Sequence, residues 1–256
     1  MSSLEALAAT PRLLVALDVD GTLAPLSDRP MEVRLTPGAR AAVLRLAGLP
    51  DTTVALVSGR TLEHLRFISE HSDDWPILLA GSHGAEYWLP GEGELARADD
   101  PAEVALRDDL QAQAQALVET LDGVWIEPKT FGLAVHTRLA SPADGDRAAR
   151  LVDDLMATRA SGWRRRTGHN VVEYAFRSEG KDSAVRVLRQ RVQATAVLFA
   201  GDDLTDEDAL ASLGPSDLGV LVGDRDTHAS VRVADIDAMA ALLARLAELR
   251  ASTQRG

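Results

Sequence analysis

The 256-residue chain contains no cysteine, few aromatic residues and fewer basic than acidic side chains. Without cysteine, disulfide bonds, thiolate zinc sites and thiol nucleophiles are excluded. Aromatic residues make up only 4% of the chain, so the stacking platforms of single-strand nucleic-acid binders are largely missing. Lys and Arg total 27 against 39 Asp and Glu, and the resulting net charge of −12 repels nucleic-acid backbones and anionic membranes. We therefore expect neither nucleic acid nor a membrane as a partner.

Membrane-length apolar segments are missing as well. Apolar runs such as Leu13–Leu17 and Ala196–Ala200 have strand length, far short of the roughly 18 residues that a membrane-spanning helix needs. The first ten residues carry Glu5 and no basic residue ahead of their apolar part, which is unlike a secretory signal. These features favour a cytoplasmic protein, and we expect a monomer.

Short apolar runs alternate with helical patterns over the first hundred residues. Continuous, β-prone runs at Leu13–Leu17, Thr53–Val57 and Ile77–Ala80 predict buried strands. Helical segments follow the first two runs, with Thr36 and Thr61 as their capping residues. Strand–helix alternation of this kind predicts a parallel sheet with helices on both faces.

The pattern changes over residues 100–178. Helix, strand and strand occur there twice in succession, which predicts a four-stranded antiparallel sheet backed by two helices (αββαββ). The first pattern then returns, with buried strands at Ala196–Ala200 and Leu218–Val222. We therefore predict an α/β fold in which a core domain is interrupted by an inserted α+β domain, with the boundaries 1–99 and 179–256 for the core and 100–178 for the insert.

Polar residues directly follow three of the predicted core strands. These segments begin at Asp18, Ser58 and Gly201. Ligands of an open parallel sheet bind outside the carboxyl ends of its strands, so the three segments should meet at one edge. This convergence is the main evidence in the sequence for an active site.

Asp18 and Asp20 stand two positions apart on an extended segment, so their side chains project to the same side, about 6–7 Å apart. That spacing lets one carboxylate approach a phosphorus atom while the other reaches the leaving oxygen. Gly21 permits a close backbone approach to a phosphate, and Thr22 beside it is a further candidate contact. The alternative is an Asx-turn after the strand, since Asp and Gly also populate turns.

An acidic string, GDDLTDED, follows the fourth buried strand. The start of a helix accounts for Asp206 to Asp208, because carboxylates favour a helix N-terminus. It does not account for Asp202 and Asp203, which follow an apolar strand and should be partly buried. Beside Asp18 and Asp20 they would repel strongly unless a divalent cation held them. Hard oxygen ligands and a phosphate substrate indicate Mg²⁺.

Three other polar residues are candidates for binding a phosphoryl group. Ser58 can donate a hydrogen bond and Arg60 can add charge, although a serine after a strand is more often a helix cap. Lys181 stands at a helix start, where a cation is unfavourable against the helix dipole. This local misfit indicates another role for Lys181, namely pairing with Asp18 and the transferring phosphate.

Six strings together resemble the trehalose-6-phosphate phosphatases of the haloacid dehalogenase superfamily. The resemblance implies a Rossmann-like core with an inserted cap, and it covers residues 12–245. Val19 departs from it, because the family often has Tyr or Phe there, which should alter packing rather than chemistry. Many phosphatases share the superfamily motifs, whereas GSHGAE, EPK and the long acidic string are narrower. The strings are LDVDGTLAPL (17–26), VSGR (57–60), GSHGAE (81–86), EPK (127–129), GK (180–181) and GDDLTDEDA (201–209).

The resemblance implies a role for each matched core residue. Asp18 would be the nucleophile and Asp20 the general acid/base. Ser58 and Lys181 would hold the phosphoryl group. The implied Mg²⁺ ligands are Asp18, the Asp20 backbone carbonyl and Asp202, with support from Asp203 and Asp206.

In the cap, the resemblance implies sugar recognition by Glu127, Lys129 and Glu173. Without it, these residues are better explained as exposed charges on strands and a turn. His83 would contact the substrate or the cap, although a histidine between small residues at a strand end is as often structural.

The implied activity is Mg²⁺-dependent hydrolysis of trehalose 6-phosphate to trehalose and phosphate through an aspartyl phosphate, a step of trehalose biosynthesis. One alternative is a phosphatase of another sugar phosphate, such as sucrose or mannosylglycerate phosphate, since only the cap strings favour trehalose. The other is a non-catalytic module that binds a sugar phosphate to control a partner synthase. The presence of Asp18, Asp20, Lys181 and Asp202 argues against that module, which has no need of all four.

Overall fold

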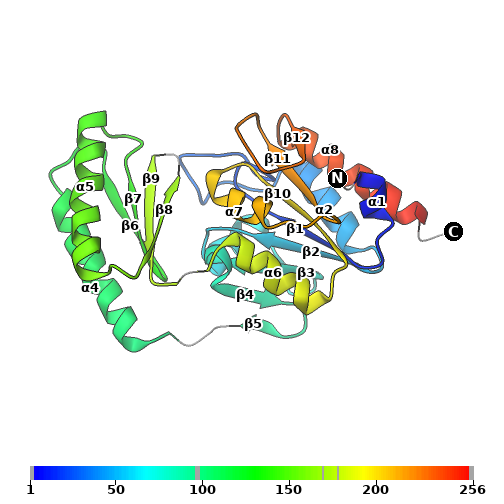
Figure 1. The fold of residues 1–256 in the computed structure, drawn as a ribbon, viewed down its shortest axis with the longest axis horizontal. Coiled ribbons are helices and arrows are strands. Elements are labelled where there is room, and N and C mark those ends of the chain that lie inside the picture. Colours follow the sequence, from blue (N-terminus) through cyan, green and yellow to red (C-terminus); the bar gives the residue numbers. More distant parts are fainter. Residues whose placement is uncertain (1–2, 96–98, 169, 178, 254–256) are drawn as a thin grey trace. The chain divides into compact units, whose positions relative to one another are not determined.

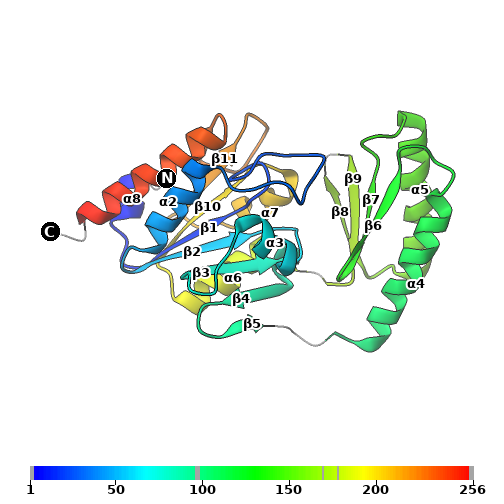
Figure 2. The same cartoon turned by 180° about the vertical axis from the view of Figure 1, so that it is seen from behind.

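The computed structural model describes residues 3–95, 99–168, 170–177 and 179–253. The chain divides into two compact units (Figures 1 and 2). Met1–Ala96 and Glu179–Gly256 form the core unit, and Arg97–Ser178 form the inserted unit. Both ends of the chain therefore belong to the core unit.

The core unit is built on an eight-stranded sheet in the order β12-β11-β10-β1-β2-β3-β4-β5. Neighbouring strands from β12 to β3 are parallel, and β4 and β5 are added antiparallel. Leu17 lies beside both Ala200 and Leu56, so β1, β2 and β10 reach the same sheet edge. The strands are β1 (Leu13–Leu17), β2 (Thr52–Val57), β3 (Ile77–Gly81), β4 (Glu86–Leu89), β5 (Gly93–Leu95), β10 (Ala196–Gly201), β11 (Leu218–Val222) and β12 (Val231–Val233).

Helices cover both faces of this sheet (Figures 1 and 2). One face packs against α1 (Leu4–Ala8), α2 (Pro37–Ala47), α3 (Leu62–Ser69) and α8 (Ile236–Thr253), and the other against α6 (Lys181–Val192) and α7 (Glu207–Ala211). Thr36 and Thr61 cap α2 and α3 through their hydroxyl groups, because each accepts a hydrogen bond from a backbone N–H of the first turn. The predicted parallel sheet with helices on both faces is confirmed.

Three short strands are not predicted by the sequence pattern. The hairpin β4–β5 begins at Glu86, inside the GSHGAE string, and β12 spans Val231–Val233. Two of these strands have only three residues each and β4 mixes polar with apolar positions, so neither an apolar run nor strict alternation marks them. They extend the sheet at its two edges and leave its central order unchanged.

The inserted unit consists of a four-stranded antiparallel sheet in the order β6-β7-β9-β8 and two helices that pack on one of its faces (Figure 1). The αββαββ prediction is confirmed. Alternate strand residues, among them Glu127, Ala134 and Glu173, point to the opposite face, which neither of these two helices covers; we call it the open face. The elements are α4 (Pro101–Val118), β6 (Trp125–Lys129), β7 (Gly132–His136), α5 (Pro142–Arg159), β8 (Arg164–Gly168) and β9 (Val171–Ala175).

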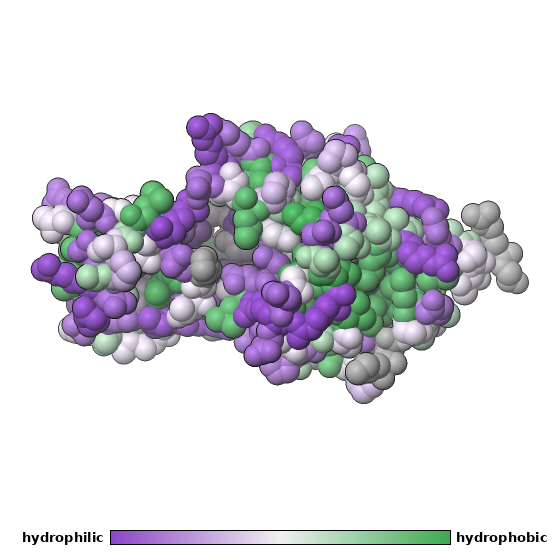
Figure 3. Space-filling model, turned by 90° about the horizontal axis from the view of Figure 1, so that it is seen from above, coloured by the Kyte–Doolittle hydropathy of each residue, from purple (hydrophilic) through white to green (hydrophobic). Residues whose placement is uncertain are grey.

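Polar and apolar residues are mixed over the surface that Figure 3 shows. Leu242 and Leu249 of α8 are partly buried and pack against the main core cluster. Within the described residues, no helix combines the length and the apolar character that crossing a membrane requires.

Arg250 of α8 is almost completely buried and joins three parts of the core unit. Its guanidinium donates to the Thr52 hydroxyl at 2.5 Å and to the backbone carbonyls of Ala8 at 3.1 Å, Thr10 at 2.8 Å and Asp51 at 2.5 Å. One side chain therefore fixes the C-terminal helix to the segment after α1 and to the turn before β2.

We expect Arg250→Met to lower the free energy of unfolding by on the order of 3 kcal/mol, because it leaves several buried acceptors without a donor. Urea unfolding of both proteins measures this difference. Arg245→Met is the matched control, since Arg245 is exposed on the same helix beside Glu248, and it should change stability by less than about 0.5 kcal/mol. Equal midpoints for Arg250→Met and the control would show that Arg250 does not join these segments.

The His71 ring of the core unit packs against two tryptophan rings. Its ring meets Trp75 and Trp88 edge-on, with centroid distances of 5.9 and 4.3 Å. Nε2 donates to the Ile77 carbonyl at 3.2 Å, whereas buried Nδ1 has no hydrogen-bond partner. Burial lowers the pKa of His71, and the bond to Ile77 only partly opposes this.

This lowered pKa predicts that the folded state becomes less stable as the pH falls. Below about pH 6.5 an unfolded His71 binds a proton that the folded one does not, so its contribution to stability falls as the pH falls toward the folded pKa. We expect the wild type to lose more stability than His71→Gln between about pH 7.5 and about pH 5.5. Urea unfolding at both values gives the difference, and other titrating groups cancel in it. Parallel losses would rule out this role for His71.

Candidate active site

The first polar residues after β1 and β2 are held by the sheet itself. Asp18 N–H donates to the Ala200 carbonyl and Ser58 N–H to the Ala80 carbonyl, both at 2.9 Å, so the parallel hydrogen bonding continues into the site. Asp18 and Ser58 are almost fully buried. Asp202 follows the end of β10 at the same edge. The predicted convergence of the three segments is therefore present.

A buried ion cluster occupies this edge. Lys181 Nζ donates to Asp18 Oδ1 at 2.6 Å and to Asp206 Oδ1 at 2.7 Å, and each of the three residues is less than 5% exposed. Asp206 Oδ2 accepts the backbone N–H groups of Asp202 and Asp203 at 3.1 and 3.0 Å. Asp206 therefore anchors both Lys181 and the turn after β10, and both of its oxygens have donors.

The cluster carries more negative than positive charge. Burial and the neighbouring Asp206 and Asp202 raise the pKa of Asp18 well above its ordinary value, although Lys181 opposes the rise. Burial and repulsion from Asp206 raise the pKa of Asp202 to about 7. Burial works against the charge of Lys181, but Asp18 and Asp206 outweigh it and raise its pKa. An additional cation would relieve the repulsion among the three carboxylates.

The carboxylate oxygens of the cluster are suitable ligands for such a cation. Asp18, Asp202 and Asp206 form a group whose ligand oxygens lie within 4.8 Å of one another, the one candidate metal cluster in the described part of the chain. Since both oxygens of Asp206 already accept hydrogen bonds, Asp18 and Asp202 are the better ligands. Gly21 has a φ of +80°, and a Cβ at this position would lie 2.0 Å from Asp202 Oδ2. Glycine at position 21 is therefore what allows the Asp202 carboxylate to lie beside the Asp18 segment. Hard carboxylate oxygens of this kind suit Mg²⁺.

Asp20 is paired with Arg60. Arg60 Nε and one terminal nitrogen donate to the two carboxylate oxygens of Asp20, each at 2.7 Å, and the Arg60 side chain is 12% exposed. This bidentate geometry holds Asp20 firmly. Arg60 therefore contacts the predicted acid/base residue and occupies one lone-pair position on each Asp20 oxygen.

Two other predicted residues have local partners. The buried Thr22 hydroxyl donates to Asp202 Oδ1 at 3.4 Å, so it orients that carboxylate. Asp203 accepts the Leu204 N–H at 2.6 Å as the cap of a short 3₁₀ turn, and it lies 3.8 Å from Arg225. The structure thus places Asp203 outside the group of three clustered carboxylates.

His83 sits in a strained turn beside Ser58. Ser82 and His83 have φ values of +47° and +57°, a conformation that costs energy in residues other than glycine. Buried His83 packs on Gly59, where a Cβ would lie 2.7 Å from the imidazole. Glu86 holds the turn, because its carboxylate accepts the Ser82 hydroxyl at 2.5 Å and the Leu62 N–H at 3.1 Å. The sequence pattern does not single out Glu86, although its place in the GSHGAE string is a signal.

The inserted unit brings its three predicted residues together on the open face. Lys129 Nζ lies 2.8 Å from Glu127 Oε1 and 3.9 Å from Glu173 Oε1. Burial alone would raise the pKa of Glu127, but a hydrogen bond from His136 and the charge of Lys129 lower it to about 2. Trp125 and His136 on the same face are absent from the sequence prediction, because only the pairing of β6 with β7 brings them beside Glu127.

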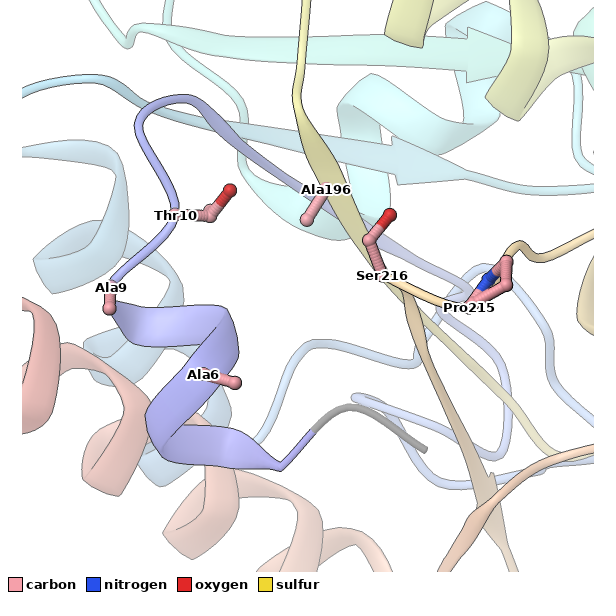
Figure 4. Close-up of a pocket in the computed structure, with 6 residues that line it drawn as sticks. All are labelled: Ala6, Ala9, Thr10, Ala196, Pro215 and Ser216. Carbon is pink, nitrogen blue, oxygen red and sulfur yellow. The ribbon is translucent and has the colours of Figure 1, made fainter.

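A surface pocket of about 350 Å³ opens at the other end of the sheet. Ala196, which begins β10, lines it, whereas Asp202 follows the end of that strand (Figure 4). Its lining side chains are small and uncharged: Ala6, Ala9, Thr10, Ala196, Pro215 and Ser216. This pocket is therefore separate from the ion cluster and offers no charged group to a phosphate.

Known proteins resemble this chain in both sequence and fold. A trehalose-phosphate phosphatase of Mycobacterium marinum is 32% identical over 233 residues, which are 86% of this chain and 57% of that protein. The chain thus spans little more than half the length of this relative. The trehalose-6-phosphate phosphatase of Escherichia coli is 28% identical over 243 residues, 91% of this chain and 87% of that protein.

The C-terminal domain of the Candida albicans trehalose-6-phosphate phosphatase has the same fold, with a TM-score of 0.82 and 21% identity, over 96% of this chain and 95% of that one. The family model of the trehalose-phosphatases matches residues 16–237. The match includes Asp18, Lys181 and Asp202 in the core unit and all of the inserted unit. The chain therefore belongs to the trehalose-phosphatase family.

Proposed function

We propose that this chain hydrolyses trehalose 6-phosphate to trehalose and phosphate with Mg²⁺ as its cofactor. The observation that carries the proposal is Lys181, buried between Asp18 and Asp206 with Asp202 beside them. A fold gains little stability from a buried group of three carboxylates and one ammonium, so its presence favours a functional role. Membership of the trehalose-phosphatase family supports the choice of substrate.

The chemistry is a two-step phosphoryl transfer. Asp18 attacks phosphorus, a bond forms between its carboxylate oxygen and phosphorus, and the bond from phosphorus to the sugar oxygen breaks. Asp20 gives a proton to the departing oxygen. Water then attacks the aspartyl phosphate while Asp20 takes its proton, which releases phosphate and restores Asp18.

The remaining core residues stabilise charge. Ser58 and Lys181 donate hydrogen bonds to the phosphoryl oxygens, where negative charge is concentrated in the transition state. Asp18, Asp202 and the backbone carbonyl of Asp20 would hold Mg²⁺, which would supply further positive charge. Arg60 orients Asp20 for proton transfer through its two hydrogen bonds and adds positive charge at this edge of the sheet.

The inserted unit is the specificity domain in this proposal. A disaccharide offers many hydroxyl groups, which charged side chains recognise better than an apolar pocket does. Glu127, Lys129 and Glu173 stand together on the open face and can accept from and donate to such hydroxyls.

Phosphate release from a panel of esters tests the proposal. The panel contains trehalose 6-phosphate, sucrose and mannosylglycerate phosphates, glucose 6-phosphate and p-nitrophenyl phosphate, each with Mg²⁺ and with EDTA. Trehalose 6-phosphate should be the best substrate, and EDTA should stop the reaction. A better sugar phosphate would replace the substrate within the phosphatase class, whereas no release from any ester would indicate a non-catalytic binding module.

We expect Glu173→Gln to lower kcat/KM for trehalose 6-phosphate by about 10–100-fold, because a site built to bind a substrate hydroxyl discriminates strongly. Hydrolysis of p-nitrophenyl phosphate, which has no sugar, should be unchanged. Glu119→Gln, at an exposed position of the same unit, is the control and should match the wild type on both substrates. Equal losses on both substrates would remove Glu173 from sugar recognition.

A further inference from the structure

Four side chains on the open face of the inserted unit form a continuous line of contacts. The rings of Trp125 and His136 are stacked, with centroids 4.7 Å apart and planes 6° apart. His136 Nε2 lies 2.8 Å from Glu127 Oε2, and Lys129 Nζ lies 2.8 Å from Glu127 Oε1. Each oxygen of Glu127 thus has one partner, and the two partners come from neighbouring strands.

The strand register explains how His136 reaches Glu127. Trp125 is directly opposite His136, and Glu127 is directly opposite Ala134. His136 and Glu127 are therefore diagonal neighbours on the same face, within reach of a long side chain and a ring. The methyl group of Ala134 leaves space above it into which the imidazole can lean.

Small residues also surround the charged groups across β7. Lys129 is paired with Gly132, where a Cβ would lie 1.7 Å from the Tyr174 carbonyl oxygen. Ala134 is flanked by Glu127 on one side and Glu173 on the other. The two carboxylates and the ammonium therefore stand beside the small residues Gly132 and Ala134 of β7 on the open face.

Among the described residues, two donors use about half of the hydrogen-bonding capacity of the Glu127 carboxylate. Its ionised carboxylate is an acceptor with about four lone-pair positions, so its partner His136 must donate through Nε2–H. The donors His136 and Lys129 occupy one position on each oxygen and fix the rotation of the group. Each oxygen keeps one position for a hydroxyl of a ligand.

We propose that His136 is a positioning residue that orients Glu127 for the hydroxyl groups of the sugar. Trp125 holds the imidazole plane by stacking, and His136 in turn holds the carboxylate plane. This inference rests on the proposed function, because it takes Glu127 as a residue that binds sugar. It adds His136 and Trp125 to the parts of the inserted unit that determine specificity.

Two substitutions separate the hydrogen bond from the stacking. His136→Phe keeps a ring against Trp125 but removes the donor, and His136→Gln restores a donor. We expect His136→Phe to raise KM for trehalose 6-phosphate about tenfold with a smaller change in kcat, and His136→Gln to recover most of the loss. Neither variant should change the hydrolysis of p-nitrophenyl phosphate or the urea midpoint by much.

A double-variant comparison makes the test specific. In a Glu127→Ala background His136→Phe should have no further effect on KM, because the residue that it positions is gone. An unchanged KM in His136→Phe, or additive effects of the two changes, would overturn the inference while Glu173→Gln still tests the proposed function. If the wild type hydrolyses no sugar phosphate, both the proposed function and this inference are rejected. If it prefers another sugar phosphate, a raised KM of His136→Phe for that substrate supports the inference, and an unchanged KM overturns it.

Discussion

Asp18→Asn should reduce phosphate release from trehalose 6-phosphate by at least about a thousandfold while the fold is kept, because a neutral amide cannot act as the nucleophile. The substitution changes little in size. Lys181 retains its bond to Asp206, so no buried charge is left unpaired. In EDTA the variant should be at least as stable as the wild type, since one of three crowded carboxylates is gone.

Phosphate release and urea unfolding, each measured on the same preparations, check both parts of this expectation. Asp226→Asn is the matched control, because Asp226 is exposed in the loop after β11 and is not one of the clustered carboxylates. It should keep wild-type activity. Appreciable turnover by Asp18→Asn, above that of a parallel preparation without the chain, would exclude a covalent reaction at Asp18.

Lys181→Met should have the largest combined effect on stability and activity. Methionine fills a similar volume but leaves Asp18 and Asp206 buried without their cation, which costs about 3–5 kcal/mol of unfolding free energy. Phosphate release should fall at least about a hundredfold, because the ammonium no longer stabilises the phosphoryl oxygens. Mg²⁺ should restore part of the lost stability, since a bound cation favours the folded state.

Urea unfolding with EDTA measures the loss of stability, and urea unfolding with Mg²⁺ measures the recovery. Lys129→Met is the control for stability, because the Lys129 pair with Glu127 is partly exposed and contributes less than about 1 kcal/mol. If Lys181→Met is as stable as the wild type in EDTA, Lys181 does not stabilise the buried carboxylates of Asp18 and Asp206. If Mg²⁺ leaves the midpoint of every protein unchanged, the cluster is not a metal site.

The sequence predicts the site residues that directly follow buried strands. Asp18, Ser58 and Asp202 follow apolar runs, and parallel pairing carries the ends of such runs to one edge. Lys181 is marked by its misfit at a helix start. The chain also has only two lysines, Lys129 and Lys181, and this scarcity is a further signal in the composition. The structure places each of them between two carboxylates.

The sequence does not predict which side chains distant along the chain contact each other. The Asp20–Arg60 pair joins residues 40 positions apart, and nothing in either string indicates that the two side chains bind each other. The same holds for His136, which meets Glu127 only because β6 and β7 pair in one register out of several. Register and side-chain orientation depend on packing throughout the unit, and a local pattern does not contain them.

The central claim is that Asp18 carries the phosphoryl group during turnover. Rapid acid quenching of the wild-type chain with trehalose 6-phosphate and Mg²⁺, followed by proteolysis and mass spectrometry, tests it directly. We predict that the peptide containing Asp18 gains the mass of one phosphoryl group and that the same peptide of Asp18→Asn gains none. A phosphoryl group on a different residue, or an unmodified Asp18 peptide at every quench time while phosphate is released, would contradict the account.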